Sequence, residues 1–367
     1  LAAGASRVAP PVRDHLVQML ALAALGAIAD VVPLRGENRI MTRFGLGLMK
    51  QPAIEGLRCL IEASRLDSDR VEAEDVGFRL APRLNAAGRM GHAREAVELL
   101  TTATGPRARE LALGLSRLND DRRAIEKRIA EDAAERALAA GMAGGDGRFI
   151  VLADPGWHRG VVGIACSRLV DRFGRPTVLL QEEGGLCSGS ARSIAGYDLH
   201  DALCGCADIL EKFGGHAMAA GLAVRMERLG ELAERLQRHA AERLAPEDLA
   251  GSVEYDTIAR ADELRTDAIE RLAALGPFGA GNPRVRVLLR SVRLSQPVRT
   301  LGSSGQHVAL HVEGDGRALR LVAWNFARHT EGLRSGQRLD VLIEPRISAY
   351  QGARSVEPEL VDLRPAG

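Results

Sequence analysis

The stretch that most constrains the fold of this chain is residues 107–142. It contains no proline, its apolar residues recur every three or four positions, and opposite charges interleave between them. This spacing gathers the apolar side chains on one face of a helix and leaves the charges on the solvated faces. It predicts one long helix or a helix pair, ended by the glycine-rich GMAGGDG at 141–147.

The part of the chain before this stretch is predicted to be helical. Residues 14–29 are rich in Ala and Leu, and the Val-Val-Pro at 31–33 stops that helix, because the residue before a proline is pushed into extended geometry. Further short helices are predicted over 53–64 and 93–102 from the same periodicity.

After residue 147, strands and helices alternate, which implies an α/β layer. RFIVLAD, PTVLLQ and GLCSGSARSI are predicted strands, and VVGIACSRLVDRFG is a predicted helix closed by Gly174. A helix over DLHDALCGCADILEKF starts at Asp198, a suitable N-cap. The glycine-rich FGGHAMAAGL at 213–222 is predicted to be a loop leading into the strand AAGLAV, and a helix follows over 227–244.

The end of the chain is rich in strand-like runs. These are VRVLLRSVRLSQPV, QHVALHVE, RALRLVAWNF and RLDVLIEPRISAY, with EGDG as a hairpin turn signal between two of them. Several short strands in about a hundred residues indicate a small barrel, and the OB type is a common example that binds nucleic acids. A small sandwich without a ligand is the alternative, because strand count does not separate the two.

Composition sets the outer limits on function. A chain of 367 residues suits two or three domains, and its net charge of +1 gives no argument for nucleic-acid binding without a local basic patch. The five cysteines lack the spacing of a zinc site and fit a reducing cytoplasm, as small buried thiols. No membrane span or signal peptide is expected, and because the chain starts at Leu1 we expect the N-terminus of a longer protein to be missing.

Two glycine- and serine-containing motifs are candidates for binding a phosphate. In GSARSI, the guanidinium of Arg192 can fork onto phosphate oxygens and the hydroxyl of Ser193 can add a hydrogen bond. In FGGHAMAAGL, Gly214 and Gly215 can open backbone N–H groups to an anion, and His216 can bond a phosphate or a bridging water. Together the motifs suggest two walls of one phosphate-binding pocket, whereas each alone is equally a turn with satisfied side chains.

Three further sites carry polar candidates. Asp30 ends an apolar run and is either a helix-end aspartate or a ligand of a hard divalent cation. RLNAAGRM is predicted to be a tight turn presenting Asn85 and Arg89, or else a turn with solvated arginines. His158 precedes a helix N-terminus, which favours anions, and its neighbour Trp157 is either part of that site or a cap on the core.

Taken in order, several motifs resemble those of a known family. They are ALGAIADVVPL with ENR at 37–39, RLNAAGRM, GWHRGVVGI, GSARSI, FGGHAMAAGL and PFGAGNP. They look like the RecJ family of single-strand-specific 5′→3′ DNA exonucleases, within the DHH phosphoesterase superfamily, and they extend across nearly the whole chain.

The resemblance implies an α/β multi-domain fold. It would comprise the rear part of a DHH phosphoesterase domain (1–104), a long connecting helix (105–146), an α/β DHH-associated substrate-binding domain (147–247) and a C-terminal OB-type β-barrel (251–367). It also implies hydrolysis of phosphodiester bonds in DNA repair and recombination, by an enzyme that works as a monomer on single-stranded DNA in the cytoplasm. A helicase and a single-strand-binding protein are the partners it suggests.

The resemblance assigns roles to the candidate residues. Relatives use two divalent metals, Mn²⁺ or Mg²⁺, and Asp30 matches the last metal-binding aspartate, which makes it a catalytic candidate. The family's earlier aspartates and its Asp-His-His motif have no match, so we expect the chain to lack most of its metal ligands and to be inactive alone. The remaining candidates match substrate-binding motifs, with His216 also in a catalytic role: Asn85, Arg89, His158, Arg192, Ser193, Gly214, Gly215 and His216.

The barrel is expected to hold the incoming strand by basic residues and stacking. Trp324 is expected to pack in the barrel core, with base stacking as the alternative, and Phe326 and Tyr350 are the other aromatic candidates. Arg317, Arg320 and Arg346 are candidate phosphate contacts or merely solvated. Two other functions stay open: a phosphodiesterase of short oligonucleotides or cyclic dinucleotides, and a non-catalytic single-stranded-DNA-binding relative.

Overall fold

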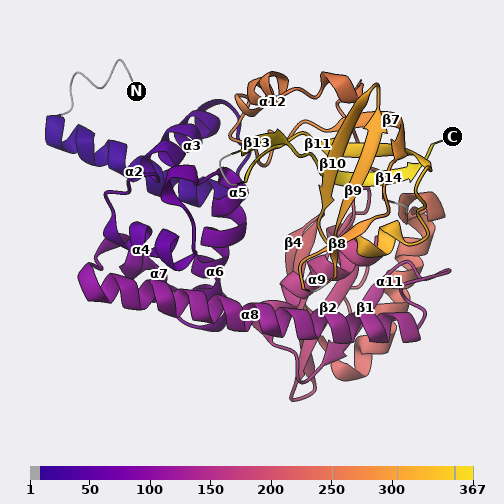
Figure 1. Cartoon of the computed structure of the whole chain (residues 1–367). Coiled ribbons are helices and arrows are strands. Elements are labelled where there is room, and N and C mark those ends of the chain that lie inside the picture. The colour runs from indigo at the N-terminus through magenta and orange to yellow at the C-terminus, as the bar shows by residue number, and fades with distance from the viewer. Residues whose placement is uncertain (1–8, 250, 304, 351–352, 367) are drawn as a thin grey trace. The chain divides into compact units, whose positions relative to one another are not determined.

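The computed structural model describes residues 9–249, 251–303, 305–350 and 353–366. The chain forms two compact units, and Figure 1 labels their elements where there is room. The first unit takes in the chain up to Ala53, the segment Asp67–Phe78 and the chain from Val253 onward. The second unit takes in Ile54–Leu66 and Arg79–Ser252.

Two helices begin the first unit. Helix α2 (Pro10–Ala29) starts with a proline in its first turn, which suits that position because the missing N–H has no partner there anyway. Helix α3 (Gly36–Leu48) packs against it so closely that a Cβ on Gly45 would lie 2.2 Å from the carbonyl oxygen of Leu20. The predicted stop holds, because α2 ends at the turn before Pro33.

Helix α2 modifies the prediction that the chain has no membrane-spanning segment. Its 20 residues have a mean hydropathy of 1.3 in the best window, only 17% of which is buried, so by length and composition alone it could cross a bilayer. Core helices of water-soluble proteins and signal sequences have the same length and hydropathy, so these two properties do not assign α2 to a membrane.

The rear of the first unit is a closed barrel of five strands. Strand β10 pairs in parallel with β14, and every other neighbouring pair in the barrel is antiparallel. The order β7–β9–β10–β14–β11 returns to β7, which is OB topology and excludes the open sandwich. The strands are β7 (Val287–Leu294), β9 (His307–Gly314), β10 (Arg317–Ala323), β11 (Arg338–Glu344) and β14 (Glu359–Pro365).

The turn signal in EGDG is confirmed between β9 and β10. Asp315 and Gly316 have φ angles of 49° and 75°, the two left-handed positions of a type I′ hairpin turn, whose twist matches that of the flanking strands. The barrel region also contains shorter elements: β6 (Thr257–Ala259), α12 (Thr266–Ala273), β8 (Arg299–Leu301), β12 (Ile347–Tyr350) and β13 (Ala353–Val356).

The PFGAGNP motif, at 277–283, ties the chain before the barrel to the turn after α2. The amide of Leu34 donates to the carbonyl of Ala280 at 2.7 Å, and Nε of Arg35 donates to the carbonyl of Gly281 at 2.7 Å. A Cβ on Gly279 would lie 2.8 Å from Cδ1 of Leu34, so a larger residue there would displace that side chain. The motif therefore has a structural role within the first unit.

The predicted long helix of the second unit is a single helix, α8 (Gly105–Ala139), of 35 residues. Its front half packs against helices from the earlier part of the chain, and its rear half packs against α9 (Arg159–Phe173). The earlier helices are α4 (Glu55–Ala63), α6 (Ala81–Met90) and α7 (Ala93–Thr101), of which α4 and α7 confirm the short helices predicted there.

Helix α6 corrects the prediction of a tight turn in RLNAAGRM. Pro82 lies in its first turn, where it favours a helix start, and the two following alanines have high helix propensity, which outweighs the single Gly88. Asn85 and Arg89 are four residues apart, so both lie on one face of the helix.

A five-stranded sheet forms the rear of the second unit. Its order is β1–β2–β3–β5–β4, parallel only between β1 and β2. Helix α9, capped by Gly174 in a left-handed conformation as predicted, packs on β2 and β3. Helices α10 (Leu199–Cys204) and α11 (Leu229–Arg243) cover the other face. The strands are β1 (Ile150–Asp154), β2 (Thr177–Glu183), β3 (Leu186–Arg192), β4 (Leu210–His216) and β5 (Ala219–Arg225).

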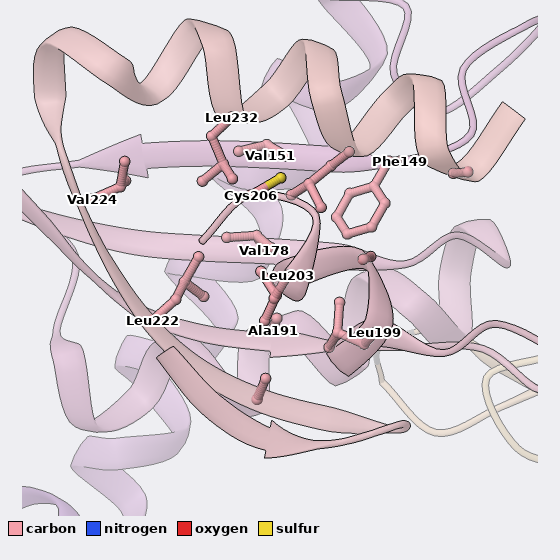
Figure 2. Close-up of a cluster of buried hydrophobic side chains, with 14 of the residues drawn as sticks. Phe149, Val151, Val178, Ala191, Leu199, Leu203, Cys206, Leu222, Val224 and Leu232 are labelled. Carbon is pink, nitrogen blue, oxygen red and sulfur yellow. The ribbon is translucent and has the colours of Figure 1, made fainter. Parts of the chain in front are cut away.

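Alternation along these strands builds the main core of the sheet. Val178 and Leu222 lie on the face below α11, where they meet Leu232 of that helix (Figure 2). Cys206 is buried in the same cluster, and four of the five thiols are buried as predicted, whereas Cys204 is exposed.

Two predictions between residues 198 and 222 were wrong in part. Asp198 does cap a helix, its carboxylate accepting from the amide of Asp201, but that helix ends at Cys204 rather than running to 213. The segment FGGH predicted as loop is the end of strand β4, and only Ala217 and Met218 form the turn. Pairing with β5 overrides the weak strand preference of the glycines.

Candidate nucleic-acid-binding site

Arg192 and His216 lie in one row of the sheet. Both are paired with Ala219, Arg192 from β3 and His216 from β4, on either side of β5. Residues directly opposite one another on neighbouring strands point to the same face. The two motifs singled out in the sequence are therefore brought together by β5, a strand that the sequence places after both.

The next row inward on this face is made of small residues. Ser190 pairs with Gly221, which pairs with Gly214. Gly214 and Gly221 are exposed, and a Cβ built on Gly214 would meet nothing within 4 Å. We call the surface formed by Arg192, Ala219, His216, Gly214 and Gly221 the glycine shelf.

Gly215 has a different task from its neighbour. Its φ angle is 151°, and a Cβ there would lie 2.3 Å from the carbonyl oxygen of Ala219. No side chain fits this position without moving the strand. Gly215 thus shapes the hairpin backbone, while Gly214 leaves the shelf open.

The positive charge of Arg192 is not balanced at the shelf. Its Nη1 donates to the carbonyl of Ala191 at 2.8 Å, and among the described residues no carboxylate forms an ion pair with it. Arg89 lies at the end of α6. Burial lowers the pKa of its guanidinium most, and the nearby charge of Arg192 lowers it further. Nη1 of Arg89 donates to the carbonyl of Gly160 at 3.3 Å.

The N-terminus of α9 borders these two arginines. His158 caps it, its Nδ1 accepting from the amide of Gly160 at 3.1 Å. A Cβ on Gly160 would lie 2.4 Å from the carbonyl oxygen of Arg89, and one on Gly163 would lie 3.4 Å from Nη2 of Arg192. Gly160 therefore lets α9 approach Arg89 closely, Gly163 places the helix in contact with Arg192, and the N-terminal dipole of α9 adds positive potential beside both arginines.

The imidazole of His216 is oriented by its own turn. Its Nδ1 accepts from the amide of Met218 at 3.3 Å, and the side chain is exposed. A neutral ring with Nδ1 as acceptor carries its proton on Nε2, and in the described part of the chain Nε2 has no partner. His216 can therefore donate a hydrogen bond to an anion on the shelf.

Ser193 and Asn85 are positioned differently from the other candidates. The hydroxyl of Ser193 donates to the carbonyl of Tyr197 at 2.7 Å and the residue is buried, so its side chain holds a turn and gives no support to a direct substrate contact. Asn85 is exposed on α6, four residues before Arg89.

A buried carboxylate lies behind the arginines. Glu126 of α8 accepts from Nη1 of Arg122 and from Nε of Arg168, both at 2.8 Å, and the charge of Glu126 partly offsets the lowered pKa of Arg89. Sequence reasoning missed this cluster, although Asn119, Arg122 and Glu126 recur at the three- and four-residue spacing of a single helix face. It also missed Gly221, which alternation along AAGLAV places on the same face as Ala219 and which pairs with Gly214.

Asp30 belongs to the first unit and is the C-cap of α2, with an exposed side chain. The cavity beside this turn has a volume of about 1010 Å³ and is lined by Val31 and Val32, but not by Asp30. Across the described ranges of the chain, no three His, Cys, Asp or Glu side chains gather as metal ligands. The residues present therefore do not fit a divalent-metal site by themselves.

The barrel candidates divide into exposed and paired residues. Trp324 is 55% exposed, so the expectation that it packs in the core is wrong; its ring meets His307 edge-on at 5.1 Å. Arg320 is paired with Glu357, and Arg346 with three carboxylates, which leaves neither as a free cation. The side chain of Tyr350 lies outside the described residues. Trp157 is buried at the core, its Nε1 donating to Asp132.

Comparison with known proteins agrees with this fold. Residues 146–242 match the model of the DHHA1 domain and residues 255–362 that of the RecJ OB domain. The single-stranded-DNA-specific exonuclease RecJ of Bacillus subtilis is 38% identical over 346 residues, covering 94% of this chain and 43% of the relative. RecJ from Thermus thermophilus, solved in complex with Mg²⁺ and with Mn²⁺, aligns at 32% identity with TM-scores of 0.81 and 0.82, covering 96% of this chain and 53% and 50% of the solved chains.

The fold and the matches together define a class of protein, in which a DHHA1 domain is followed by an OB-type barrel. Within that class, the resemblance to RecJ drawn from the motifs is confirmed, as is the OB-type fold. The chain spans about half the length of the relatives it matches.

Proposed function

We propose that this chain holds single-stranded DNA by its sugar–phosphate backbone on the glycine shelf, as part of a RecJ-type 5′→3′ exonuclease. The observation that carries the proposal is the charge of Arg192, which pairs with no carboxylate of the described residues, beside a surface without side chains at Gly214 and Gly221. A cation without a protein counterion, next to open backbone, suits a flexible polyanion better than a compact apolar ligand.

The chemistry of the shelf supports backbone rather than base recognition. The planar guanidinium of Arg192 can donate two parallel hydrogen bonds to phosphate oxygens. Nε2–H of His216 can donate a third, from the other side of β5. Because the glycines remove side chains between these donors, the strand can approach the sheet closely. Such contacts carry no sequence information, which fits an exonuclease that must accept any base.

The barrel is proposed to extend the grip along the strand. Trp324 offers an exposed aromatic face, and bases stack on such faces with little sequence preference. This favours a strand of many nucleotides over the alternative substrates, short oligonucleotides or cyclic dinucleotides, which do not need a barrel.

We propose that hydrolysis belongs to the whole enzyme, with Asp30 as one ligand of a site for two Mn²⁺ or Mg²⁺ ions. The described residues supply no partner ligands for Asp30, so we assign no step of hydrolysis to this chain. A non-catalytic DNA-binding role for the chain itself therefore remains the second candidate. From the resemblance we further propose a cytoplasmic monomer acting in DNA repair and recombination, with a helicase and a single-strand-binding protein as partners.

The test measures binding and Mn²⁺-dependent degradation of a 5′-phosphorylated single-stranded oligonucleotide by this chain. We expect binding, and a Kd that rises about tenfold in R192A, with the slope of log K against log salt reduced by about 0.7 for one lost phosphate contact. R238A, an exposed arginine on α11, is the matched control and should change neither by as much. Equal effects of the two variants would mean that DNA binds through general charge attraction, and would refute the proposal that the glycine shelf is the binding site.

A further inference from the structure

Behind the shelf, three side chains form a hydrogen-bonded chain that links two helices. The hydroxyl of Tyr197 lies 2.8 Å from Nδ1 of His239 on α11, and Nε2 of His239 lies 3.2 Å from a carboxylate oxygen of Asp201 on α10. Tyr197 is 2% exposed, and its ring also meets those of His239 and Phe149 edge-on. A buried hydroxyl without a partner is costly, so this geometry holds Tyr197 firmly against α11.

The segment that carries Tyr197 is in turn bonded to the hairpin of His216. The amide of Ser193 donates to the carbonyl of Met218, and the amide of Leu199 donates to the carbonyl of Ala217, both at 3.0 Å. Ala217 and Met218 are the whole turn between β4 and β5. The hydroxyl of Ser193 closes the segment on itself by donating to the carbonyl of Tyr197.

The last link is the imidazole of His216. The amide of Met218, whose carbonyl accepts from Ser193, donates to Nδ1 of His216. The peptide group between Ala217 and Met218 is therefore held on both sides, because its carbonyl, that of Ala217, accepts from the amide of Leu199, while its N–H donates to the ring. A shift of the segment 193–199 would move the Met218 amide and with it the direction of Nε2.

We propose that Tyr197, His239 and Asp201 form a positioning relay that fixes the Ala217–Met218 turn and thereby aims the imidazole of His216 at the shelf. The relay rests on α11, whose apolar face is anchored in the sheet core by Leu232 and Leu236. These are positioning residues, because none of them lies on the shelf itself. The inference deepens the proposed function, on which its binding consequence rests.

The test uses the 367-residue chain with Y197F, which removes one oxygen and keeps the ring. Y255F, at a tyrosine 46% exposed in the first unit, is the matched control. Histidine-selective ¹H–¹⁵N NMR reports on the ring of His216, whose cross-peak is assigned by its loss in H216A. Amide exchange at Met218, thermal unfolding and the Kd for a 5′-phosphorylated single-stranded oligonucleotide complete the set.

For Y197F we expect a shifted His216 cross-peak, amide exchange at Met218 that is about tenfold faster, and a Kd that rises about fivefold, as for one lost hydrogen bond. Y255F should change none of them. An unchanged His216 cross-peak and unchanged Met218 exchange in folded Y197F would overturn the relay.

A second pair of variants covers the case in which Y197F does not fold. H239Q keeps a group that can accept from Tyr197 or donate to Asp201, whereas H239A removes both, so the relay predicts that H239Q retains the His216 signal better than H239A. Identical spectra for the two would overturn it. If the unmodified chain does not bind the oligonucleotide, the proposed function fails, while the NMR and exchange results still decide the relay.

Discussion

Arg192 and His216 face the same residue, Ala219, from opposite sides of strand β5. They are 24 positions apart in the sequence, and antiparallel pairing alone brings them into one row. The shelf between them is formed by residues of three strands, β3, β4 and β5. A substitution on one strand can therefore change one part of the shelf and leave the others in place.

Neighbouring glycines give the first prediction. G214V should leave the melting temperature within about 2 °C, because its Cβ enters open space and valine suits a strand. It should raise the Kd for single-stranded DNA about tenfold by filling the shelf. G215A should instead lower stability by about 1–3 kcal/mol, because its Cβ would meet the carbonyl of Ala219 at a φ of 151°. Thermal unfolding and fluorescence anisotropy on both variants separate the two effects. A loss of stability in G214V with normal stability in G215A would contradict the roles given to the two glycines.

A second prediction concerns His216 in the intact enzyme. H216A should lower turnover far more than stability, because the residue is exposed and, among the described residues, its ring bonds only to the amide of Met218 in its own turn. Turnover of a 5′-phosphorylated strand and urea unfolding are measured on the same preparations. A loss of stability in proportion to the loss of turnover would make His216 a structural residue.

The sequence indicated much of this fold through local signals. Gly174, the EGDG turn and the Asp198 cap all act within a few residues, and all three are where the pattern predicted them. The predictions failed where pairing partners decide the outcome. FGGH becomes a strand because β5 pairs with it. Trp324 is exposed, and its hydrophobicity alone does not show on which side of the barrel wall it lies.

The candidate site shows the same division. The motifs containing Arg192 and His216 stand out by composition, so they could be grouped before their pairing was known. The bonds of Tyr197 to His239, and of Ser193 to Met218, span tens of residues and follow no spacing rule. Such contacts are set by tertiary packing, and the sequence contains no local signal for them.

The ion pairs of the buried Glu126 give a third prediction. E126Q should destabilise the chain by about 3 kcal/mol, because it leaves Arg122 and Arg168 without their shared carboxylate, and Glu126 is only 4% exposed. E135Q, on the exposed face of the same helix, is the control and should stay within about 0.5 kcal/mol. DNA binding by folded E126Q should not weaken, because less negative charge then lies behind Arg89. Urea unfolding measures the stability and fluorescence anisotropy the DNA binding of both variants. Weaker DNA binding by E126Q with unchanged stability would contradict the prediction.

A fourth prediction follows from the thiol of Cys166. Complete burial raises the pKa of this thiol to about 12, from an ordinary value near 9. The unfolded chain therefore loses this proton at lower pH than the folded one. The contribution of the buried neutral thiol to the free energy of unfolding is fully present below pH 9 and is lost as pH rises toward 12. The slope reaches at most about 1.4 kcal/mol per pH unit. Urea unfolding between about pH 8.5 and 10.5 should show a steeper decline for the unmodified chain than for C166A, and parallel declines would contradict it.

Trp324 gives the last prediction, which depends on strand length. Loss of one stacking platform costs about 1–3 kcal/mol of binding, so W324A should raise the Kd for a long single strand by at least fivefold. Its ring is 55% exposed, so stability should change little. A strand of only a few nucleotides, held by the shelf alone, should bind W324A and the unmodified chain equally. F326A is a contrasting variant, because that ring stacks on His329 and packs against the barrel core, so it should lose stability at every strand length. Equal weakening of short and long strands by W324A would mean that the barrel does not extend the grip.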